Sequence, residues 1–414
     1  MDQQERVLIA ACQLPGKDEE RFQSSLEELG SLTETAHGVV EKIITQKRQR
    51  RHQALYMGEG KIQEIQQYIE EMEIDLVIFN DELTPGQMNN LADYLDVRII
   101  DRTQLILDIF AQRAHTKEGK LQVELAQLQY MLPRLSGQGK NLSRLGGGIG
   151  TRGPGETKLE SDRRHIQRRI DDIKRQIQQV ANQRQQYRKR RKENKAFQIA
   201  IVGYTNAGKS TLFNRITNSQ SFEENQLFAT LDPLTRQINL PSGTQVLLSD
   251  TVGFIQDLPT TLIAAFQSTL EEVTEADFIV HMVDASHPDH IQHEQTVHKH
   301  LKELKADHLP TLTVYNKKDL LDEQFMPVSL PAITISAHDP IDIKRLFAKI
   351  EEVLKEEWEP FQTYVNPSEG AYLHRITRHS IVTDRDFLEE EELYMIRGYI
   401  HPEHPIYQQI RQEK

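Results

Sequence analysis

The feature that most constrains the fold is the segment Gly203–Ser210, which fits the pattern G-x-x-x-x-G-K-[ST] without a mismatch. The apolar run Phe197–Val202 comes directly before it, and Thr211–Ile216 follows as the start of a helix. A strand, a glycine loop and a helix N-terminus form an anion site, because backbone N–H groups converge there and the helix dipole favours phosphate. The sequence therefore predicts an α/β domain that binds a nucleoside triphosphate.

The loop supplies most of the predicted phosphate contacts. Gly203 and Gly208 permit a backbone course that a Cβ would block. We expect Lys209 to reach the β- and γ-phosphates and the Ser210 hydroxyl to bind Mg²⁺. Nucleotide contacts are predicted along the whole loop and at the first residue after it: Gly203, Tyr204, Thr205, Asn206, Ala207, Gly208, Lys209, Ser210 and Thr211.

A second motif, D-x-x-G, begins at Asp250 and ends at Gly253, directly after the strand Gln245–Ser249. In nucleotide-binding domains of this kind the aspartate holds Mg²⁺ through water and the glycine N–H meets the γ-phosphate. The residue that follows is Phe254, at the position where many switch GTPases have the glutamine that orients the attacking water. Because a phenyl ring offers no hydrogen-bonding group, we expect slow intrinsic hydrolysis that needs help from a partner.

The nucleotide base is predicted from two later motifs. Asn316-Lys317-Lys318-Asp319 closes the strand Thr311–Tyr315. A carboxylate such as that of Asp319 accepts from the guanine N1–H and N2 amino groups, and adenine has no such pair of donors. We expect the stem of Lys317 to lie over the base, and a backbone N–H of Ser336-Ala337 to meet guanine O6. The order of these motifs, each after a strand, predicts a domain that binds GTP and GDP with Mg²⁺ as cofactor.

The switch I threonine is expected between the P-loop helix and Asp250. The best candidate lies in Phe228–Pro233, where Thr230 would bind Mg²⁺ with its hydroxyl and the γ-phosphate with its N–H. Phe228 is also expected at the nucleotide. Thr235 is the alternative threonine.

Two stretches upstream of the P-loop have heptad-like spacing. Leu121, Leu125, Leu128 and Leu132 follow a 4/3/4 pattern in the first, and Ile166, Ile170, Ile173, Ile177 and Val180 follow 4/3/4/3 in the second. Such spacing predicts two long helices that pack along an apolar seam. The glycine-rich segment 136–157 joins them, and Thr157 with Glu160 fits a capping box for the second helix. The simplest structure is a long antiparallel helical hairpin with a large tip loop.

The charge of the chain is unevenly distributed. From Arg134 to Lys195 there are 18 lysines and arginines and 6 acidic residues, a net charge of +12. Because the whole chain has a net charge of −12, the remainder has −24. A basic arm on an acidic body is typical of a nucleic-acid-binding protein. A flexible glycine-rich tip can also bring backbone close to RNA.

Length and composition set wider limits. A chain of 414 residues exceeds one ordinary domain. Its first part alternates apolar strands with helical stretches, which predicts a small sheet covered by helices. The longest apolar runs are strand-sized and too short for a membrane span, and the single cysteine, Cys12, lies in an apolar run that predicts a core residue. The five histidines in 287–300 are interpreted as surface residues, not as a metal site.

The tip residues Gly146–Glu160, directly upstream of the P-loop, together with Phe228–Pro233 and Asp250–Phe254, resemble the HflX family of ribosome-associated GTPases. The resemblance covers residues from about 5 to 360 of the sequence. It implies an α/β fold: a Ras-like P-loop GTPase domain (196–358), preceded by a small α/β subdomain (1–112) and a long antiparallel α-helical hairpin (113–195), and followed by a small α+β C-terminal domain (359–414).

The same resemblance implies a function. It implies binding to the large ribosomal subunit (50S) and the 70S ribosome, near the peptidyl-transferase centre, and GTP-dependent splitting of stalled or idle ribosomes, as in heat stress. The nucleotide-binding motifs themselves predict catalytic contributions from Lys209, Thr230, Gly253 and Phe254, with Mg²⁺ held by Ser210, Thr230 and, through water, Asp250. RNA contacts are implied for the tip and the start of the second helix, at Arg144, Gly146, Gly147, Gly148, Arg152, Gly153 and Lys158. We expect a cytoplasmic monomer and leave peripheral membrane association open.

Two other functions are compatible with a GTPase domain in this chain. A tRNA-modifying GTPase would have a catalytic cysteine near its C-terminus, and the segment 406–411 of this chain has none. The other is an RNA-binding GTPase switch in ribosome assembly, in which hydrolysis is incidental. GTP turnover measured with and without ribosomal subunits distinguishes these functions.

Overall fold

A computed structural model describes residues 4–16, 18–137, 154–193, 196–217, 227–256, 267–322 and 325–412. The chain forms two compact units. The first unit comprises Met1–Asn182, Asn225–Asp232 and Gln256–Gln267. The second unit comprises Gln183–Glu224, Pro233–Ile255 and Ser268–Lys414. The predicted hairpin therefore belongs mainly to the first unit, and the last three strands belong to the same unit as the P-loop.

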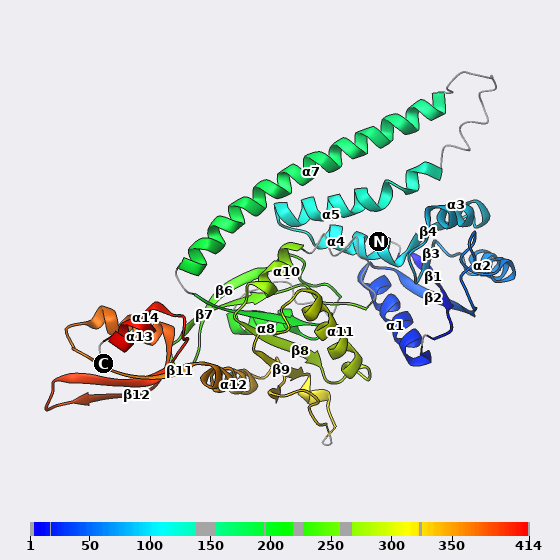
Figure 1. Ribbon diagram of the computed structural model, residues 1–414. Helices are drawn as coiled ribbons and strands as arrows, with labels where there is room; N and C mark the ends of the chain where they lie inside the picture. Colours follow the sequence, from blue (N-terminus) through cyan, green and yellow to red (C-terminus); the bar gives the residue numbers. More distant parts are fainter. Residues whose placement is uncertain are drawn as a thin grey trace. The chain divides into compact units, whose positions relative to one another are not determined.

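The first unit contains a parallel four-stranded sheet of order β2-β1-β3-β4 (Figure 1). Its strands are β1 (Arg6–Gln13), β2 (Val39–Lys47), β3 (Leu76–Phe79) and β4 (Arg98–Asp101). Its helices before the hairpin are α1 (Glu19–Thr35), α2 (Glu59–Glu71), α3 (Pro85–Tyr94) and α4 (Arg102–Arg113). Leu8, Ala10 and Cys12 share a core cluster with residues of α2 and α3. Val7, Ile9 and Ala11, which alternate with these residues along β1, are also buried. They point to the opposite face of the sheet, where α1 and α4 contact each other.

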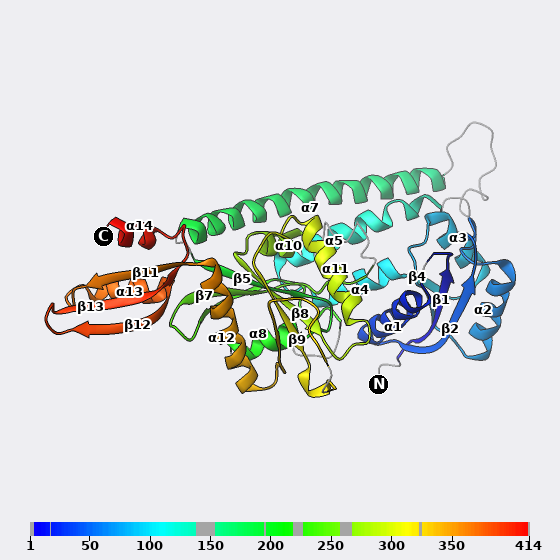
Figure 2. The same cartoon turned by 60° about the horizontal axis from the view of Figure 1, so that its bottom comes forward.

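The helical hairpin consists of α5 (Lys117–Met131), the short helix η1 (Arg134–Gly137) and α7 (Pro154–Glu193). Helices α5 and α7 lie side by side in both views (Figures 1 and 2). Ile170 and Ile173 are buried, as the heptad pattern predicts. The Arg169 guanidinium donates to both carboxylate oxygens of Glu124, at 2.7 and 2.8 Å.

The second helix begins earlier than the sequence pattern suggested. It starts at Pro154, so the expected capping box at Thr157 lies inside the helix and is wrong. Proline is favoured at the first helical position, because its missing N–H is one that a helix start leaves unpaired and its φ is already helical.

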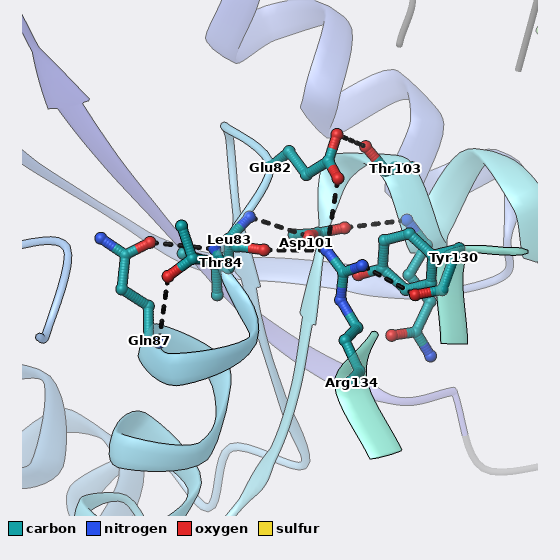
Figure 3. Close-up of polar contacts among 9 residues, drawn as sticks. Glu82, Leu83, Thr84, Gln87, Asp101, Thr103, Tyr130 and Arg134 are labelled. Carbon is teal, nitrogen blue, oxygen red and sulfur yellow. Dashed lines mark hydrogen bonds and ion pairs between the residues drawn. The ribbon is translucent and has the colours of Figure 1, made fainter. Parts of the chain in front are cut away.

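A buried polar cluster holds the C-terminal end of the first hairpin helix to the sheet (Figure 3). Asp101, the last residue of β4, accepts hydrogen bonds from the Leu83 and Gln104 N–H groups, each at 2.9 Å. Arg134 lies 3.5 Å from the same carboxylate, and its guanidinium lies over the Tyr130 ring at 3.4 Å. Burial raises the pKa of Asp101. The cluster therefore joins the end of α5 to the carboxyl edge of the sheet.

The second unit contains a six-stranded sheet of order β10-β9-β8-β5-β7-β6, parallel except for β6. Its strands are β5 (Phe197–Gly203), β6 (Leu234–Asn239), β7 (Gln245–Asp250), β8 (Phe278–Asp284), β9 (Thr311–Asn316) and β10 (Ala332–Thr334). One core cluster lies under α8 (Lys209–Thr217) and α12 (Pro340–Glu357). The other lies under α10 (Gln267–Thr274) and α11 (His290–Glu303). This arrangement confirms the predicted α/β P-loop domain.

A third sheet, antiparallel and of order β11-β13-β12, follows in the same unit. Its elements are β11 (Glu359–Val365), α13 (Gly370–His379), β12 (Ser380–Leu388), β13 (Leu393–Ile400) and α14 (Pro405–Gln412). The Thr244 hydroxyl donates to the Ser380 carbonyl at 2.7 Å and the Arg378 guanidinium donates to Gln245, so this α+β region is bonded to the P-loop sheet. In the described part of the chain, no helix is long and apolar enough to cross a membrane.

Candidate nucleotide site

The P-loop lies between the end of β5 and the start of α8. A Cβ at Gly203 would lie 2.2 Å from the Met282 carbonyl oxygen, and one at Gly208, where φ is +91°, would lie 2.2 Å from Asn316 Nδ2. Only glycine therefore fits at either position. The Thr205 hydroxyl oxygen is buried and has no hydrogen-bond partner among the described residues. A glycine loop between a strand and a helix N-terminus, with an unpaired buried hydroxyl in it, fits a bound phosphate chain.

Lys209 is a buried cation in this loop. It is 6% exposed, and its Nζ donates to the Tyr204 carbonyl at 2.7 Å. Burial lowers the pKa of Lys209 to about 8, and the charge of Asp250 opposes that shift. Because phosphate oxygens would supply negative charge to a desolvated ammonium group, the site favours an anionic ligand.

The D-x-x-G segment lies against the P-loop. Asp250 ends β7 and is 1% exposed. The Phe254 N–H donates to the Gly203 carbonyl at 3.1 Å, and the Phe254 carbonyl accepts from the Thr205 N–H at 2.8 Å. A Cβ at Gly253 would lie 3.1 Å from Lys209 Nζ. The structure therefore brings the predicted phosphate and magnesium residues of the second unit to one place.

The Phe254 ring belongs to the core. It is 6% exposed and packs with Val202, Tyr204 and Val273. Its face stacks on His300 with ring centres 5.3 Å apart. The residue that follows D-x-x-G therefore acts as an apolar anchor for this loop.

The side-chain amide of Asn316 links the N-K-x-D motif to the P-loop and to Ser336-Ala337. Asn316 Nδ2 donates to the Ala207 carbonyl at 2.9 Å, and Asn316 Oδ1 accepts from the Ala337 N–H at 2.9 Å. The N–H that we expected to meet guanine O6 is thus bonded to Asn316 in this structure. The Ser336 N–H donates to Asp342 at 2.9 Å. The Ser336-Ala337 segment therefore orients Asn316 and, through it, the P-loop.

The two other side chains predicted to contact guanine, those of Lys317 and Asp319, have different surroundings. Lys317, with φ of +63°, donates to Asp284 at 2.6 Å. Asp319 is exposed, and a hydrogen bond from Ser336 lowers its pKa, so its carboxylate is ionised at neutral pH.

Sequence reasoning missed Asp284 and Asp342. Asp284 could have been found, because it ends β8 as Asp250 ends β7 and Asn316 ends β9, and the carboxyl ends of parallel strands share one edge.

The favoured switch I candidate, Thr230, belongs to the first unit, together with Phe228. Thr230 is half-buried there, and the Phe228 ring packs edge-on against Phe110 with centres 4.7 Å apart. The alternative, Thr235, lies in β6, and its hydroxyl pairs with that of Ser249 at 2.8 Å. Because Thr235 is part of the sheet and its hydroxyl is already paired, Thr230 remains the candidate for the switch I threonine.

The predicted RNA-binding tip lies largely outside the described residues. This applies to Arg144, Gly146, Gly147, Gly148, Arg152 and Gly153. Lys158 lies in the first turns of α7.

The prediction that the histidines lie at the surface is wrong for His293. This residue is 9% exposed, and its ring stacks on Tyr204 of the P-loop at 3.8 Å. The signal was present in the sequence, because His293 lies four residues before Val297 on the apolar face of α11. Among the described residues there is no group of histidines, cysteines and carboxylates that could hold a metal.

A parallel sheet whose strand ends bear a P-loop, D-x-x-G and N-K-x-D defines a GTPase of the P-loop class. Three family profiles match the chain: "GTP-binding GTPase N-terminal" over residues 23–111, "GTP-binding GTPase Middle Region" over 113–191 and "50S ribosome-binding GTPase" over 198–317. A GTPase HflX of Alkalihalophilus pseudofirmus is 54% identical over 409 residues, which are 99% of this chain and 96% of the relative. The chain belongs to the HflX family of GTPases.

More distant similarity extends over most of the chain. A GTPase HflX of Escherichia coli is 40% identical, with 90% of this chain and 89% of the relative covered. The solved complex of SsGBP with GDP is 24% identical with a TM-score of 0.49, and it covers 85% of this chain and 99% of that chain.

Proposed function

We propose that this GTPase binds the large ribosomal subunit and the 70S ribosome and promotes GTP-dependent splitting of stalled or idle ribosomes, for example under heat stress. The observation that carries the proposal is a long basic helix in the same chain as a GTPase domain. Five basic side chains are exposed along α7: Arg163, Arg164, Arg168, Lys174 and Arg175. Such a row suits the phosphate backbone of ribosomal RNA.

The contacts with the RNA are proposed to come from the tip segment and the start of α7. Arg144 and Arg152 would pair with phosphates, while Gly146–Gly148 and Gly153 would allow close approach of the tip backbone near the peptidyl-transferase centre. Lys158 would extend these contacts along α7. A cytoplasmic location follows from this partner.

In the GTPase site, Lys209 would bind the β- and γ-phosphates and the Gly253 N–H would report the γ-phosphate. The Ser210 and Thr230 hydroxyls, with Asp250 through water, would hold Mg²⁺. Mg²⁺ prefers oxygen ligands such as these hydroxyl and carboxylate groups. When bound, Mg²⁺ neutralises part of the phosphate charge. Asn316, Lys317 and Asp319 would select guanine.

Hydrolysis is proposed to be slow without the ribosome. Phe254 is an apolar anchor and orients no water, so a group supplied by the ribosome, or switch residues ordered by it, must do so. An RNA-modification chemistry that needs a thiol is disfavoured, because Cys12 is buried in β1.

The test is GTP turnover alone, with purified 50S subunits and with 70S ribosomes. We expect strong stimulation by 50S, and dissociation of 70S on sucrose gradients with GDPNP but not with GDP. Absence of any effect of either particle on turnover would contradict the proposal. Stimulation by 50S without dissociation of 70S would instead favour the ribosome-assembly switch.

A further inference from the structure

The two residues before α5, His115 and Thr116, bind one carboxylate of the switch I segment, and this binding place is called the seat of Asp232. Asp232 accepts hydrogen bonds from the His115 N–H at 3.0 Å, the Thr116 N–H at 2.8 Å and the Thr116 hydroxyl at 2.5 Å. Thr116 is itself the N-cap of α5, and its hydroxyl oxygen accepts from the Gly119 N–H at 2.9 Å. The side chain of Asp232, two residues from Thr230, is thereby bonded to the start of the hairpin.

Gly119 gives independent support for this seat. Glycine in a helix is destabilising relative to alanine, so its place in the first turn of α5 needs a reason. A Cβ at Gly119 would lie 2.3 Å from Asp232 Oδ1. Gly60 in α2 has nothing within 4 Å of its Cβ position. The glycine at 119 therefore leaves room for the Asp232 carboxylate.

Two other segments next to the nucleotide motifs contact helices of the first unit: residues 227–228, before Thr230, and Gln256, after D-x-x-G. The Leu227 N–H donates to the Thr35 hydroxyl of α1 at 3.3 Å, and the Phe228 ring packs on Phe110 of α4. Beyond D-x-x-G, the Gln256 carbonyl accepts from Arg102, a buried arginine at the start of α4, at 3.4 Å. The residues that flank the nucleotide motifs thus contact helices α1 and α4 and the start of the hairpin.

We propose that Asp232 is a positioning residue that couples the nucleotide state to the hairpin. If a bound triphosphate and its Mg²⁺ engaged Thr230, Asp232 would leave its seat, and the His115 and Thr116 N–H groups would lose their acceptor. A displacement of α5 by a bound ribosome acts on Thr230 through the same link. This inference rests on the proposed function in two places: the role of Thr230 at the nucleotide and, in the last step, ribosome binding.

Amide hydrogen exchange of the free protein over residues 113–120 tests the link without ribosomes. In the wild type we expect exchange at His115 and Thr116 to be roughly fivefold faster with GDPNP than with GDP, the effect of one lost N-terminal acceptor. Asp232→Ala and Gly119→Ala should exchange fast with both nucleotides. Gly60→Ala, an added methyl group in open space, should behave like the wild type.

Gly119→Ala separates coupling from simple destabilisation, because alanine favours the helix while its methyl group displaces the carboxylate. Equal exchange with both nucleotides in the wild type, or slower exchange with GDPNP, overturns the proposal. The proposal is also overturned if Asp232→Ala still shows a difference in amide exchange between GDP and GDPNP.

A second measurement uses 50S subunits. Asp232→Ala should lose at least about tenfold of the stimulated turnover while still pelleting with 50S. If 50S fails to stimulate even the wild type, the proposed function fails, and the exchange result still decides the coupling.

Discussion

Asp319 is the residue on which the choice of base should depend. It is exposed, its carboxylate is ionised, and Ser336 beside it donates a hydrogen bond. Asp319→Asn replaces an acceptor by a donor toward guanine N1 and N2, and xanthine offers the complementary acceptor. We expect the preference for GTP over xanthosine triphosphate to fall by at least about a hundredfold. Competition binding with a fluorescent nucleotide measures this, and a retained GTP preference would refute the guanine-reading role.

Phe254 is the second residue whose role can be isolated. Its ring is buried beside Tyr204 and stacked on His300. Phe254→Gln would bury an amide without matched partners, so we expect a loss of about 3 kcal/mol in the free energy of unfolding. Unstimulated hydrolysis should not increase, as single-turnover measurements would establish. Phe254→Leu keeps an apolar side chain, so its free energy of unfolding and its unstimulated hydrolysis rate should stay close to those of the wild type. A tenfold gain in hydrolysis by the glutamine variant would contradict the anchor role.

At the scale of elements, the packing of α11 on β8 buries a histidine without hydrogen-bond partners. His281 is 1% exposed, and neither ring nitrogen has a partner among the described residues. Burial lowers its pKa to about 3, with His298 and Lys209 acting in the same direction and Glu294 against it. Between pH 6.5 and 3 the unfolded chain therefore binds a proton that the folded chain does not. The free energy of unfolding must fall as the pH falls through this range.

His281→Met keeps a similar volume and removes this linkage. We expect the loss of stability between pH 7.5 and pH 5 to be smaller by about 2 kcal/mol than in the wild type. Urea denaturation at the two pH values measures it. His308→Gln, a change at an exposed histidine, is the control and should leave the pH dependence unchanged. An unchanged pH dependence in His281→Met would show that the buried imidazole is not the group responsible.

At the scale of the whole molecule, the hairpin should connect the GTPase site to RNA. Deletion of Gly146–Gly153 ends before Pro154, where α7 begins, and leaves both helices intact. We expect stimulation by 50S to disappear while unstimulated turnover remains. Survival of the stimulation would show that the tip is not required.

The basic face of α7 is tested separately by salt. Binding to 50S, measured by pelleting between 50 and 300 mM KCl, should weaken steeply, because phosphate contacts release counterions. Arg163→Gln and Arg168→Gln should each reduce the salt slope by about one, whereas Lys344→Gln on α12 should not. Unchanged slopes in the α7 variants would place the RNA contacts elsewhere.

Much of this fold could be predicted because its signals are local. The P-loop lies between adjacent strand and helix residues, and the isoleucine spacing of α7 predicted Ile170 and Ile173 at its buried seam. Helix α1 has a local signal of the same kind, because Phe22, Leu26 and Leu29 are buried at helical spacing. The start of α7 was misplaced because a local capping signal competed with Pro154.

The sequence alone determined which chemistry the chain performs, since each GTPase motif is a short contiguous segment whose residue types are tied to phosphate, Mg²⁺ or guanine. The tertiary structure decided how the motifs are joined. Asn316 bridges two loops 109 and 21 positions away, and Asp232 binds Thr116 across 116 positions. Contacts of such separation leave no periodicity in the sequence, because they form only when distant strand ends and helix starts pack together.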